Sequence, residues 1–164
     1  MNILFVHPSG AFGGASKSLI ELYKVLSQYS VLGTVLCPVG SAGRAFQDAG
    51  LKLFQIRGLA QWDNTRYGHY RSFRWLILLR EIFLLPFTWI ALRKLLKSHS
   101  FDIVHLNEVT LLPWARLIRR WSGVPVIVHV RSLQRGATED FRTRCFNRAL
   151  SRDVDKVVAI DETV

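Results

Sequence analysis

Residues 1–27, MNILFVHPSGAFGGASKSLIELYKVLS, decide the fold class of this chain. A short apolar run at positions 3–6 meets His7 and Pro8 and a glycine-rich loop, after which leucine, isoleucine and tyrosine recur at helical spacing. Glycine lets backbone N–H groups approach a ligand, and a helix N-terminus carries partial positive charge, so such a loop suits a phosphate. A plain tight turn without a ligand is equally compatible, because the glycine spacing does not form a strict dinucleotide fingerprint. The stretch predicts a strand, a turn and a helix of an α/β protein.

The rest of the chain repeats this alternation. Further strands are expected at 31–37, 51–56, 101–106, 124–130 and 155–160, with helices at 42–49, 73–98, 111–121 and 138–150. Short connections between alternating strands and helices imply parallel strands covered on both faces. We therefore predict a single Rossmann-like domain over 1–164, with a doubly wound, mostly parallel sheet of about six strands.

Composition limits the class of partner. The 164 residues are 49% hydrophobic, as in a folded globular chain, and carry a net charge of +10. Such a surface favours anionic partners, namely acidic lipid, phosphorylated small molecules or nucleic acid, but no nucleic-acid-binding motif is recognisable. Cys37 and Cys145 lack metal-ligand spacing and are predicted to be reduced, buried thiols, with no metal or other cofactor. The first apolar run is too short for a signal peptide, so a cytoplasmic protein is expected.

Two segments depart from the simple alternation. Residues 57–72 interleave arginines with Trp62, Tyr67 and Tyr70, which suits a sugar, a base or a lipid head group but also a plain surface loop with its aromatics on the sheet edge. Residues 73–98 are the most hydrophobic stretch, in which Arg74, Glu81 and Thr88 form one narrow polar line.

The hydrophobic stretch 73–98 has three interpretations. The simplest is a core helix on the sheet, kinked or restarted at Pro86. The second is an interfacial helix with its wide apolar face in a membrane and basic residues at the head groups, namely Arg93, Lys94 and Lys97. A transmembrane span is the least favoured, because a charged pair interrupts the run.

Candidate site residues gather where the predicted strands end, since ligands of open parallel sheets bind beyond the carboxyl ends of the strands. The residues at these ends include Ser9, Gly13, Gly14, Ala15, Ser16, Trp62, Tyr67, Asn107, Glu108, Arg131, Ser132 and Asp161. They contain no recognisable Ser/His/Asp or Cys/His set, and His105 is expected to be a core histidine.

Four segments together resemble one known family. The opening strand and glycine loop, FDIVHLNE (101–108), GVPVIVHVRS (123–132) and DKVVAIDE (155–162) are similar to the N-terminal domain of the group 1 (family four) retaining glycosyltransferases of the GT-B fold. In that family the first loop usually ends Gly-Gly-Ala-Glu, and later strands read "PDVVHxHS" and "D-x-VIAVSE". The four matches occur in the order of the family and cover most of the chain.

The resemblance implies a division of labour. The N-terminal domain binds the acceptor, whereas a C-terminal domain, absent from this chain, holds the nucleotide-sugar. Binding of the nucleotide-sugar would then fall to a missing segment or to a separate chain. Gly13 and Gly14, with Ala15 and Ser16, would line the donor diphosphate and sugar. The acceptor cleft would contain Ser9, Trp62, Tyr67, Asn107, Glu108 and Asp161.

Departures from the family pattern affect the catalytic residues. Ser16 stands where the family has an acid, Asp161 replaces a serine, and Arg131 aligns with a histidine often found after the fifth strand. Arg131 and His129, two positions earlier, are therefore the catalytic candidates. We expect the isolated chain to be nearly inactive, with an exposed and mobile glycine loop and no tightly bound nucleotide.

The acceptor is expected to be lipid-linked or part of an envelope polysaccharide, and the protein to lie peripherally on the inner face of a membrane. Two alternatives remain: a non-catalytic, membrane-recruiting subunit of a split glycosyltransferase, and a basic domain that binds nucleotides or nucleic acid.

Overall fold

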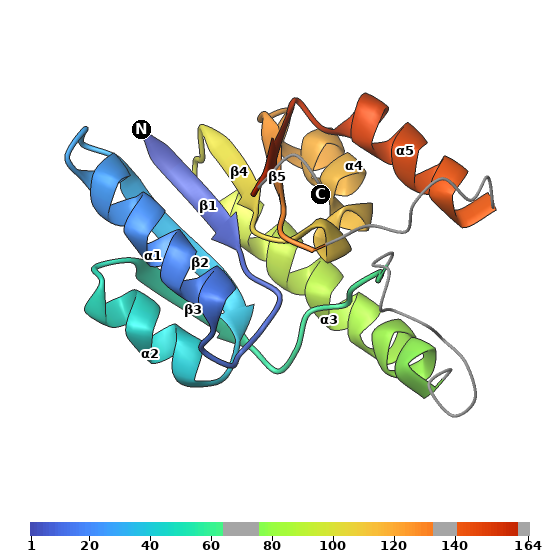
Figure 1. Cartoon of the computed structure of the whole chain (residues 1–164), viewed down its shortest axis with the longest axis horizontal. Helices are drawn as coiled ribbons and strands as arrows, with labels where there is room; N and C mark the ends of the chain where they lie inside the picture. The colour runs from blue at the N-terminus through green and yellow to red at the C-terminus, as the bar shows by residue number, and fades with distance from the viewer. Residues whose placement is uncertain (64–75, 133–140, 161–164) are drawn as a thin grey trace.

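A computed structural model describes residues 1–63, 76–132 and 141–160 (Figure 1). The described residues form one six-stranded sheet in the order β3-β2-β1-β4-β5-β6, and every neighbouring pair is parallel. The strands are β1 (Asn2–Val6), β2 (Leu32–Pro38), β3 (Lys52–Ile56), β4 (Ile103–Leu106), β5 (Val126–Val130) and β6 (Lys156–Ala159). The predicted Rossmann-like α/β class is confirmed.

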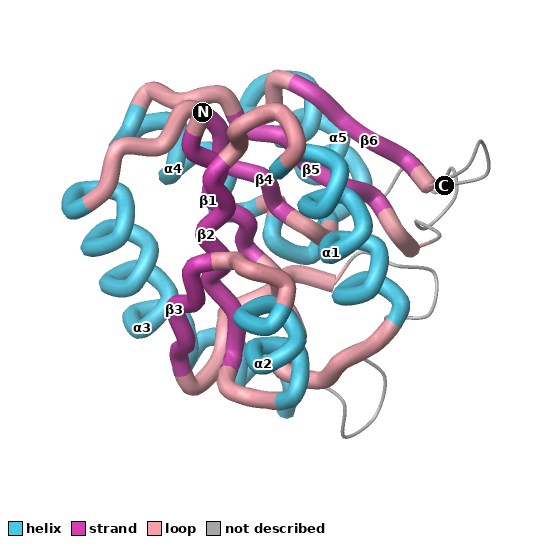
Figure 2. Tube along the Cα trace, turned by 90° about the vertical axis from the view of Figure 1, so that its left-hand side faces the viewer, coloured by secondary structure: helices cyan, strands magenta, loops and turns pink. Residues whose placement is uncertain are grey.

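Helices cover both faces of the sheet (Figure 2). The helices are α1 (Gly14–Ser27), α2 (Ser41–Asp48), α3 (Leu76–Ser98), the short 3-10 helix η2 (Val109–Leu111), α4 (Pro113–Ser122) and α5 (Phe141–Asp153). In Figure 2, α1 and α2 lie on one side of the strands and α3 on the other. Gly123 ends α4 in the left-handed conformation, with φ of 68°, as its position after the helical pattern predicts.

The alternation of β1 builds both halves of the core. Ile3 and Phe5 pack with the buried residues of α1 and α2, whereas Leu4 and Val6 pack with those of α3, α4 and α5. This follows from the two-residue period of a strand, which sends successive side chains to opposite faces. A strand buried on both sides reads as a continuous apolar run, and β1 does so.

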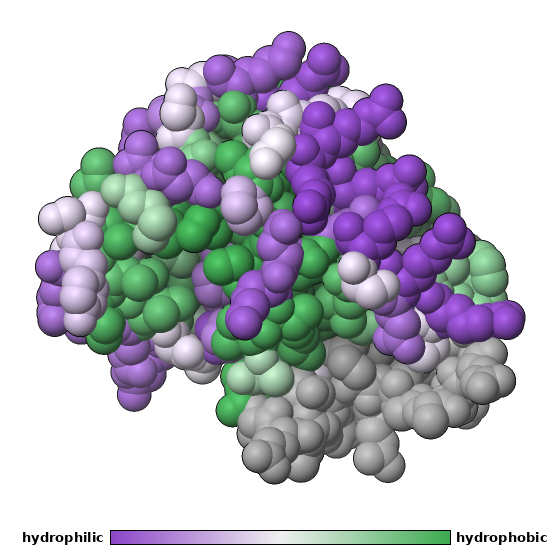
Figure 3. Space-filling view, turned by 90° about the horizontal axis from the view of Figure 1, so that it is seen from above, coloured by the Kyte–Doolittle hydropathy of each residue, from purple (hydrophilic) through white to green (hydrophobic). Residues whose placement is uncertain are grey.

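The α1 side of the sheet is only partly covered. Along β5 the side chains alternate between buried and half-buried, and β6 is exposed along its length. A groove of about 590 Å³ lies there, between α1 and the strands, and its lining includes Phe5, Leu22, Val25, His105, Ile127, His129 and Val158. Viewed from above, hydrophilic side chains gather on the right, where α5 lies in Figure 1, and hydrophobic ones in the middle and on the left (Figure 3).

Helix α3 packs on the core in an unexpected orientation. It continues through Pro86 as one 23-residue helix, which excludes the second of the two alternatives for Pro86, a new helix starting there. Its buried residues are Glu81, Leu84, Thr88, Leu92 and Leu95, whereas large apolar residues are exposed, namely Leu76, Leu79, Ile82, Phe83, Leu85, Phe87, Trp89 and Ile90. Glu81 and Thr88 of the polar line therefore face inward and the wide apolar face outward, while Arg74 falls outside the described residues. Over the described ranges, no helix is long and apolar enough to cross a membrane.

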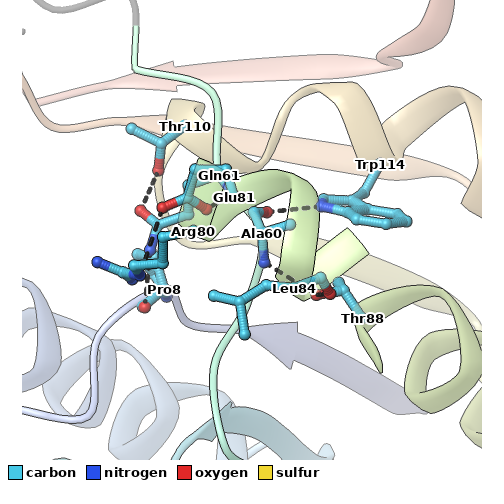
Figure 4. Close-up of polar contacts among 9 residues, drawn as sticks. All are labelled: Pro8, Ala60, Gln61, Arg80, Glu81, Leu84, Thr88, Thr110 and Trp114. Carbon is cyan, nitrogen blue, oxygen red and sulfur yellow. Dashed lines mark hydrogen bonds and ion pairs between the residues drawn. The ribbon is translucent and has the colours of Figure 1, made fainter. Parts of the chain in front are cut away.

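The polar side chains of α3 are buried because they bond to the backbone of the preceding loop (Figure 4). Thr88 Oγ1 accepts a hydrogen bond from the Ala60 N–H at 2.9 Å, and Glu81 Oε2 accepts one from the Gln61 N–H at 2.6 Å. A buried N–H without a partner is costly, so these contacts favour the observed rotation of the helix.

The prediction for the two cysteines is wrong in one respect. Both thiols are free, and Cys37 is buried in the α1–α2 core, but Cys145 is exposed. Helix α5 packs inward through Phe146, and the adjacent position on a helix points about 100° away, which turns Cys145 off the core.

Candidate functional site

Three neighbouring strands end in polar residues that meet at one edge of the sheet. His7 follows β1, Asn107 follows β4, and Arg131 follows β5. The strands are in register, because Val6 pairs with Leu106, which pairs with Val128. Residues just past these strands therefore lie side by side at the carboxyl edge, where open parallel sheets bind their ligands.

Arg131 and Asn107 are joined by two hydrogen bonds. Arg131 Nη2 donates to Asn107 Oδ1 at 2.9 Å, and Arg131 Nε donates to the Asn107 carbonyl at 3.2 Å. Because a guanidinium only donates, the amide oxygen of Asn107 must face Arg131. The amide nitrogen then faces the other way, where it donates to His7 Nδ1 at 2.8 Å and to the Ala15 carbonyl at 3.2 Å.

The chain of hydrogen bonds continues into helix α1. Since His7 Nδ1 accepts from Asn107, the ring proton lies on Nε2, which donates to Ser16 Oγ at 3.1 Å. His7, Ser16 and Asn107 are each 1% exposed or less. The polar chain, defined here as Arg131, Asn107, His7 and Ser16, links the ends of three strands to the first turn of α1.

His129 joins the site through Arg131. Arg131 Nη2 lies 3.0 Å from His129 Nδ1, which must therefore accept the bond. These contacts engage Nε and Nη2 of the guanidinium and leave the two N–H groups of Nη1 without a partner among the described residues. Arg131 thus presents two donors to a ligand.

The histidines around Arg131 are neutral at pH 7. Burial, reinforced by the nearby Arg131 charge, lowers the pKa of His7 and of His129 to about 4. Burial, then His129 and Arg131, lowers the pKa of His105 to about 3. The rings of His105 and His129 stack with centroids 5.7 Å apart, and His105 is buried, as expected for a core histidine.

Glu108 provides a carboxylate beside Arg131. Its Oε1 accepts from the Val109 N–H at 2.9 Å, and its Oε2 accepts from Ser132 Oγ at 3.3 Å. Burial raises the pKa of Glu108, although these hydrogen bonds and Arg131 oppose the rise; burial lowers the pKa of Arg131, which Glu108 opposes. Each group therefore offsets part of the effect of burial on the pKa of the other.

The glycine loop presents the open N-terminus of α1. Gly13 and Gly14 are exposed, and a Cβ added at either position would have no atom within 4 Å. No side chain caps this helix end, and its first turn carries no acidic residue. The first N–H groups of a helix lack intrahelical partners, so this end suits an anion.

Packing requires glycine at two other positions, Gly10 in the same loop and Gly40 in the loop before α2. A Cβ on Gly10 would lie 2.4 Å from the Val39 carbonyl oxygen, and a Cβ on Gly40 would lie 2.1 Å from the Gly10 oxygen. These glycines let two loops touch, so part of the glycine pattern reflects packing.

Of the remaining predicted site residues, Ser9 and Trp62 form hydrogen bonds with residues outside the polar chain. Ser9 Oγ accepts from the Ala11 N–H at 3.1 Å within its own turn. Trp62 is 44% exposed and lies beside α3 and α4. Its backbone N–H donates to the Thr110 carbonyl at 2.7 Å. Tyr67 and Asp161 fall outside the described residues.

His7 is the site residue to which the sequence assigned no role. Its signal was its position directly after a buried strand, which it shares with Asn107. Thr88 and Glu81 were recognised as polar, but nothing in the sequence indicated that they bond to residues 60 and 61. In the part of the chain that the structure describes, no three His, Cys, Asp or Glu side chains are grouped to hold a metal ion.

A parallel, doubly wound sheet with polar side chains past its strands belongs to the Rossmann-like α/β class, in which ligands bind at the carboxyl edge. The family model described as a glycosyl transferase 4-like domain matches residues 13–164. The chain therefore belongs to the glycosyl transferase 4-like family, and the resemblance to GT-B glycosyltransferases is confirmed. A search of curated proteins finds no match.

Solved structures share the fold. Anabaena HepE, solved with UDP-glucose, is 16% identical with a TM-score of 0.65 over 99% of this chain and 38% of its own. Acinetobacter baumannii MurG is 19% identical with a TM-score of 0.57 over 99% of this chain and 42% of its own. The chain thus spans about two fifths of the length of these proteins.

Proposed function

We propose that this chain is the acceptor-side, N-terminal half of a retaining glycosyltransferase. The complete enzyme transfers a sugar from a nucleotide-sugar to an acceptor, while a second domain or a separate chain holds the nucleotide. The observation that carries the proposal is the polar chain, which aims Arg131 and the first turn of α1 at the same edge of the sheet. Membership of the glycosyl transferase 4-like family supports it.

The chemistry of this half is stabilisation of the leaving diphosphate. Charge develops on the phosphate oxygens as the bond to the sugar breaks, and donors already in place for that charge lower the barrier. The donors here are the N–H groups at Gly13, Gly14, Ala15 and Ser16 and the free Nη1 of Arg131. Asn107 and His129 fix the guanidinium, which removes the entropic cost of ordering it during the reaction.

The acceptor would enter at the same carboxyl edge, where the proposed cleft has Ser9, Trp62, Asn107 and Glu108 among its described residues. HepE, which shares the fold of this chain, was solved with UDP-glucose, which supports a nucleotide-sugar as the donor class. We further propose an acceptor that is lipid-linked or belongs to an envelope polysaccharide, used at the inner face of a membrane; the exposed apolar residues of α3 support this.

A reconstitution assay tests the proposal. The 164-residue chain is combined with the donor-binding half, and transfer from radiolabelled nucleotide-sugars to membrane extracts is measured. We expect transfer only with both halves, and a first product that keeps the anomeric configuration of the donor, read by NMR. Tight nucleotide binding by this chain alone would contradict the division of roles, and an inverted product would contradict the retaining mechanism.

A further inference from the structure

The loop at residues 58–62 separates two cavities of opposite character. On one side lies a basic pocket of about 380 Å³, whose lining includes Ser9, Gly10, Arg57, Gln61 and Arg80. On the other lies an apolar groove of about 360 Å³ between α3 and α4, whose lining includes Trp62, Leu78, Ile82, Leu85, Trp114 and Leu117. Gln61 lines both, so the two cavities adjoin.

The dividing loop is held from both sides (Figure 4). Gln61 donates from Nε2 to the Pro8 carbonyl at 3.1 Å and accepts at Oε1 from Thr110 Oγ1 at 3.1 Å. Trp114 Nε1 donates to the Ala60 carbonyl at 2.8 Å, opposite the bond from the Ala60 N–H to Thr88. The backbone groups of Ala60 and the side chain of Gln61 are thus hydrogen-bonded. These bonds hold the loop in place, so the two cavities are preformed.

The basic pocket carries two cations and no counter-charge of its own. Arg57 and Arg80 line it, and none of its described lining residues is acidic. Glu81 Oε1 lies 3.6 Å from Arg80 Nε, but Glu81 lines the apolar groove and spends its other oxygen on the Gln61 N–H. The Arg80 side chain is 60% exposed, so its other N–H groups can contact an anion while Nε stays near Glu81.

The apolar groove continues past Trp62 along the surface. A second apolar cavity, of about 510 Å³, shares Trp62, Leu78 and Pro113 with it and extends to Phe146 on α5. Ile82 is 61% exposed and Leu85 is 46% exposed at its rim. Contiguous exposed apolar surface of this kind marks a binding site rather than ordinary surface.

We propose that the basic pocket and the apolar groove together bind one phosphorylated lipid. Its phosphate contacts Arg57 and Arg80, and its hydrocarbon chain lies in the groove between α3 and α4. Charge complementarity selects the anion, because guanidinium groups pair closely with phosphate oxygens, and each methylene placed in the groove leaves water. The inference rests on the proposed function, in which this lipid phosphate would be the acceptor-side substrate.

Octyl phosphate, below its critical micelle concentration, is the probe for this site. NMR titration of the 164-residue chain follows the indole N–H signals of Trp62 and Trp114, which line the groove, with Trp89 and Trp121 as internal references. We expect saturable shifts at the first pair. Inorganic phosphate and octanol should each bind more weakly, because each fills only one of the two cavities.

Matched variants locate the two halves of the site. Arg80→Gln and Ile82→Ser should each weaken octyl phosphate binding by about fivefold to tenfold. Arg93→Gln and Ile90→Ser, on the same helix but outside both cavities, should leave binding unchanged; Ile90 is 62% exposed, as Ile82 is 61% exposed.

Three outcomes would overturn the proposal. Absence of saturable shifts at Trp62 and Trp114 would mean that neither lipid nor phosphate binds there. Equal weakening of octyl phosphate binding by Ile82→Ser and Ile90→Ser would mean that the whole exposed face of α3 binds hydrocarbon without specificity. Binding to phosphatidylglycerol vesicles without binding of octyl phosphate would make the face a bilayer contact. The titration contains no nucleotide-sugar. Failure of the transfer assay therefore leaves the octyl phosphate result intact, and failure of octyl phosphate binding leaves the transfer result intact.

Discussion

Helices α1 and α3 lie on opposite faces of the same sheet and use their polar residues in opposite ways. In α1 the buried residues are Leu19, Tyr23 and Ser16, and Ser16 completes the polar chain, while the exposed residues are mostly polar, with Val25 as the exposed apolar one. In α3 the buried Glu81 and Thr88 hold a loop, and large apolar residues face outward. The difference teaches that α1 uses its buried polar residue to order a site and exposes little apolar surface, whereas α3 uses its buried polar residues to hold a loop and exposes a wide apolar face.

The largest effect is expected on the α1 side, in the reconstituted transferase. Arg131→Gln removes the guanidinium that the polar chain orders toward the leaving phosphate, so the transfer rate should fall about 10²- to 10³-fold. Arg131→Lys should recover only part of the rate, because an ammonium has one nitrogen and cannot hold Asn107 and His129 while presenting a second nitrogen to the phosphate. The matched control is Arg44→Gln on the exposed face of α2, which should keep the full rate.

The second-largest effect is expected from acid, which should lower the free energy of unfolding through the buried histidines on the α1 side of the sheet. His7 and His105 have folded pKa values of about 4 and 3, below the unfolded value of about 6.5, so the unfolded chain binds more protons as the pH falls. The free energy of unfolding should therefore decrease between about pH 6.5 and pH 4, by on the order of 3 kcal/mol for each histidine. Urea unfolding at several pH values measures this slope, and His105→Phe should make it shallower; an unchanged slope would contradict the assignment.

On the α3 side, Glu81→Ala should cost stability without touching the polar chain. It leaves the partly buried Gln61 N–H without its acceptor, a loss of about 1 to 3 kcal/mol in the free energy of unfolding. Glu21→Ala, at an exposed position of α1, should change stability by less than about 0.5 kcal/mol. Denaturant unfolding of both variants makes the comparison, and equal effects would mean that the loop contact is not stabilising.

The smallest effect is expected on the outer face of α3. Phe83 is 68% exposed, so Phe83→Ser should change the free energy of unfolding by only about 0.5 kcal/mol. Leu92→Ser, two turns away on the buried side and 0% exposed, should cost several times more. Thermal unfolding of the pair sharpens the contrast between the two faces, and a large loss at Phe83 would show that this face is covered after all.

Much of the fold was predictable because it depends on local patterns. Short buried strands separated by helices, such as 2–6 and 103–106, read directly as a parallel sheet, and Gly123 marked the end of α4. The candidate site was predictable in outline, since Asn107 and Arg131 stand just past strands. The orientation of α3 was not predictable, because an amphipathic pattern favours burial of the apolar face, which is the face that the structure exposes.

The sequence by itself determined the α/β class, the strand ends that gather at one edge, and membership of the glycosyl transferase 4-like family. Only the tertiary structure decided that His7 joins Asn107 to Ser16, and that Glu81 and Thr88 face inward. The reason is physical: strand periodicity is set by each residue and its neighbours, whereas a buried polar group turns toward whichever partner the fold brings to it. That partner lies far away in the chain, 100 residues for His7 and Asn107.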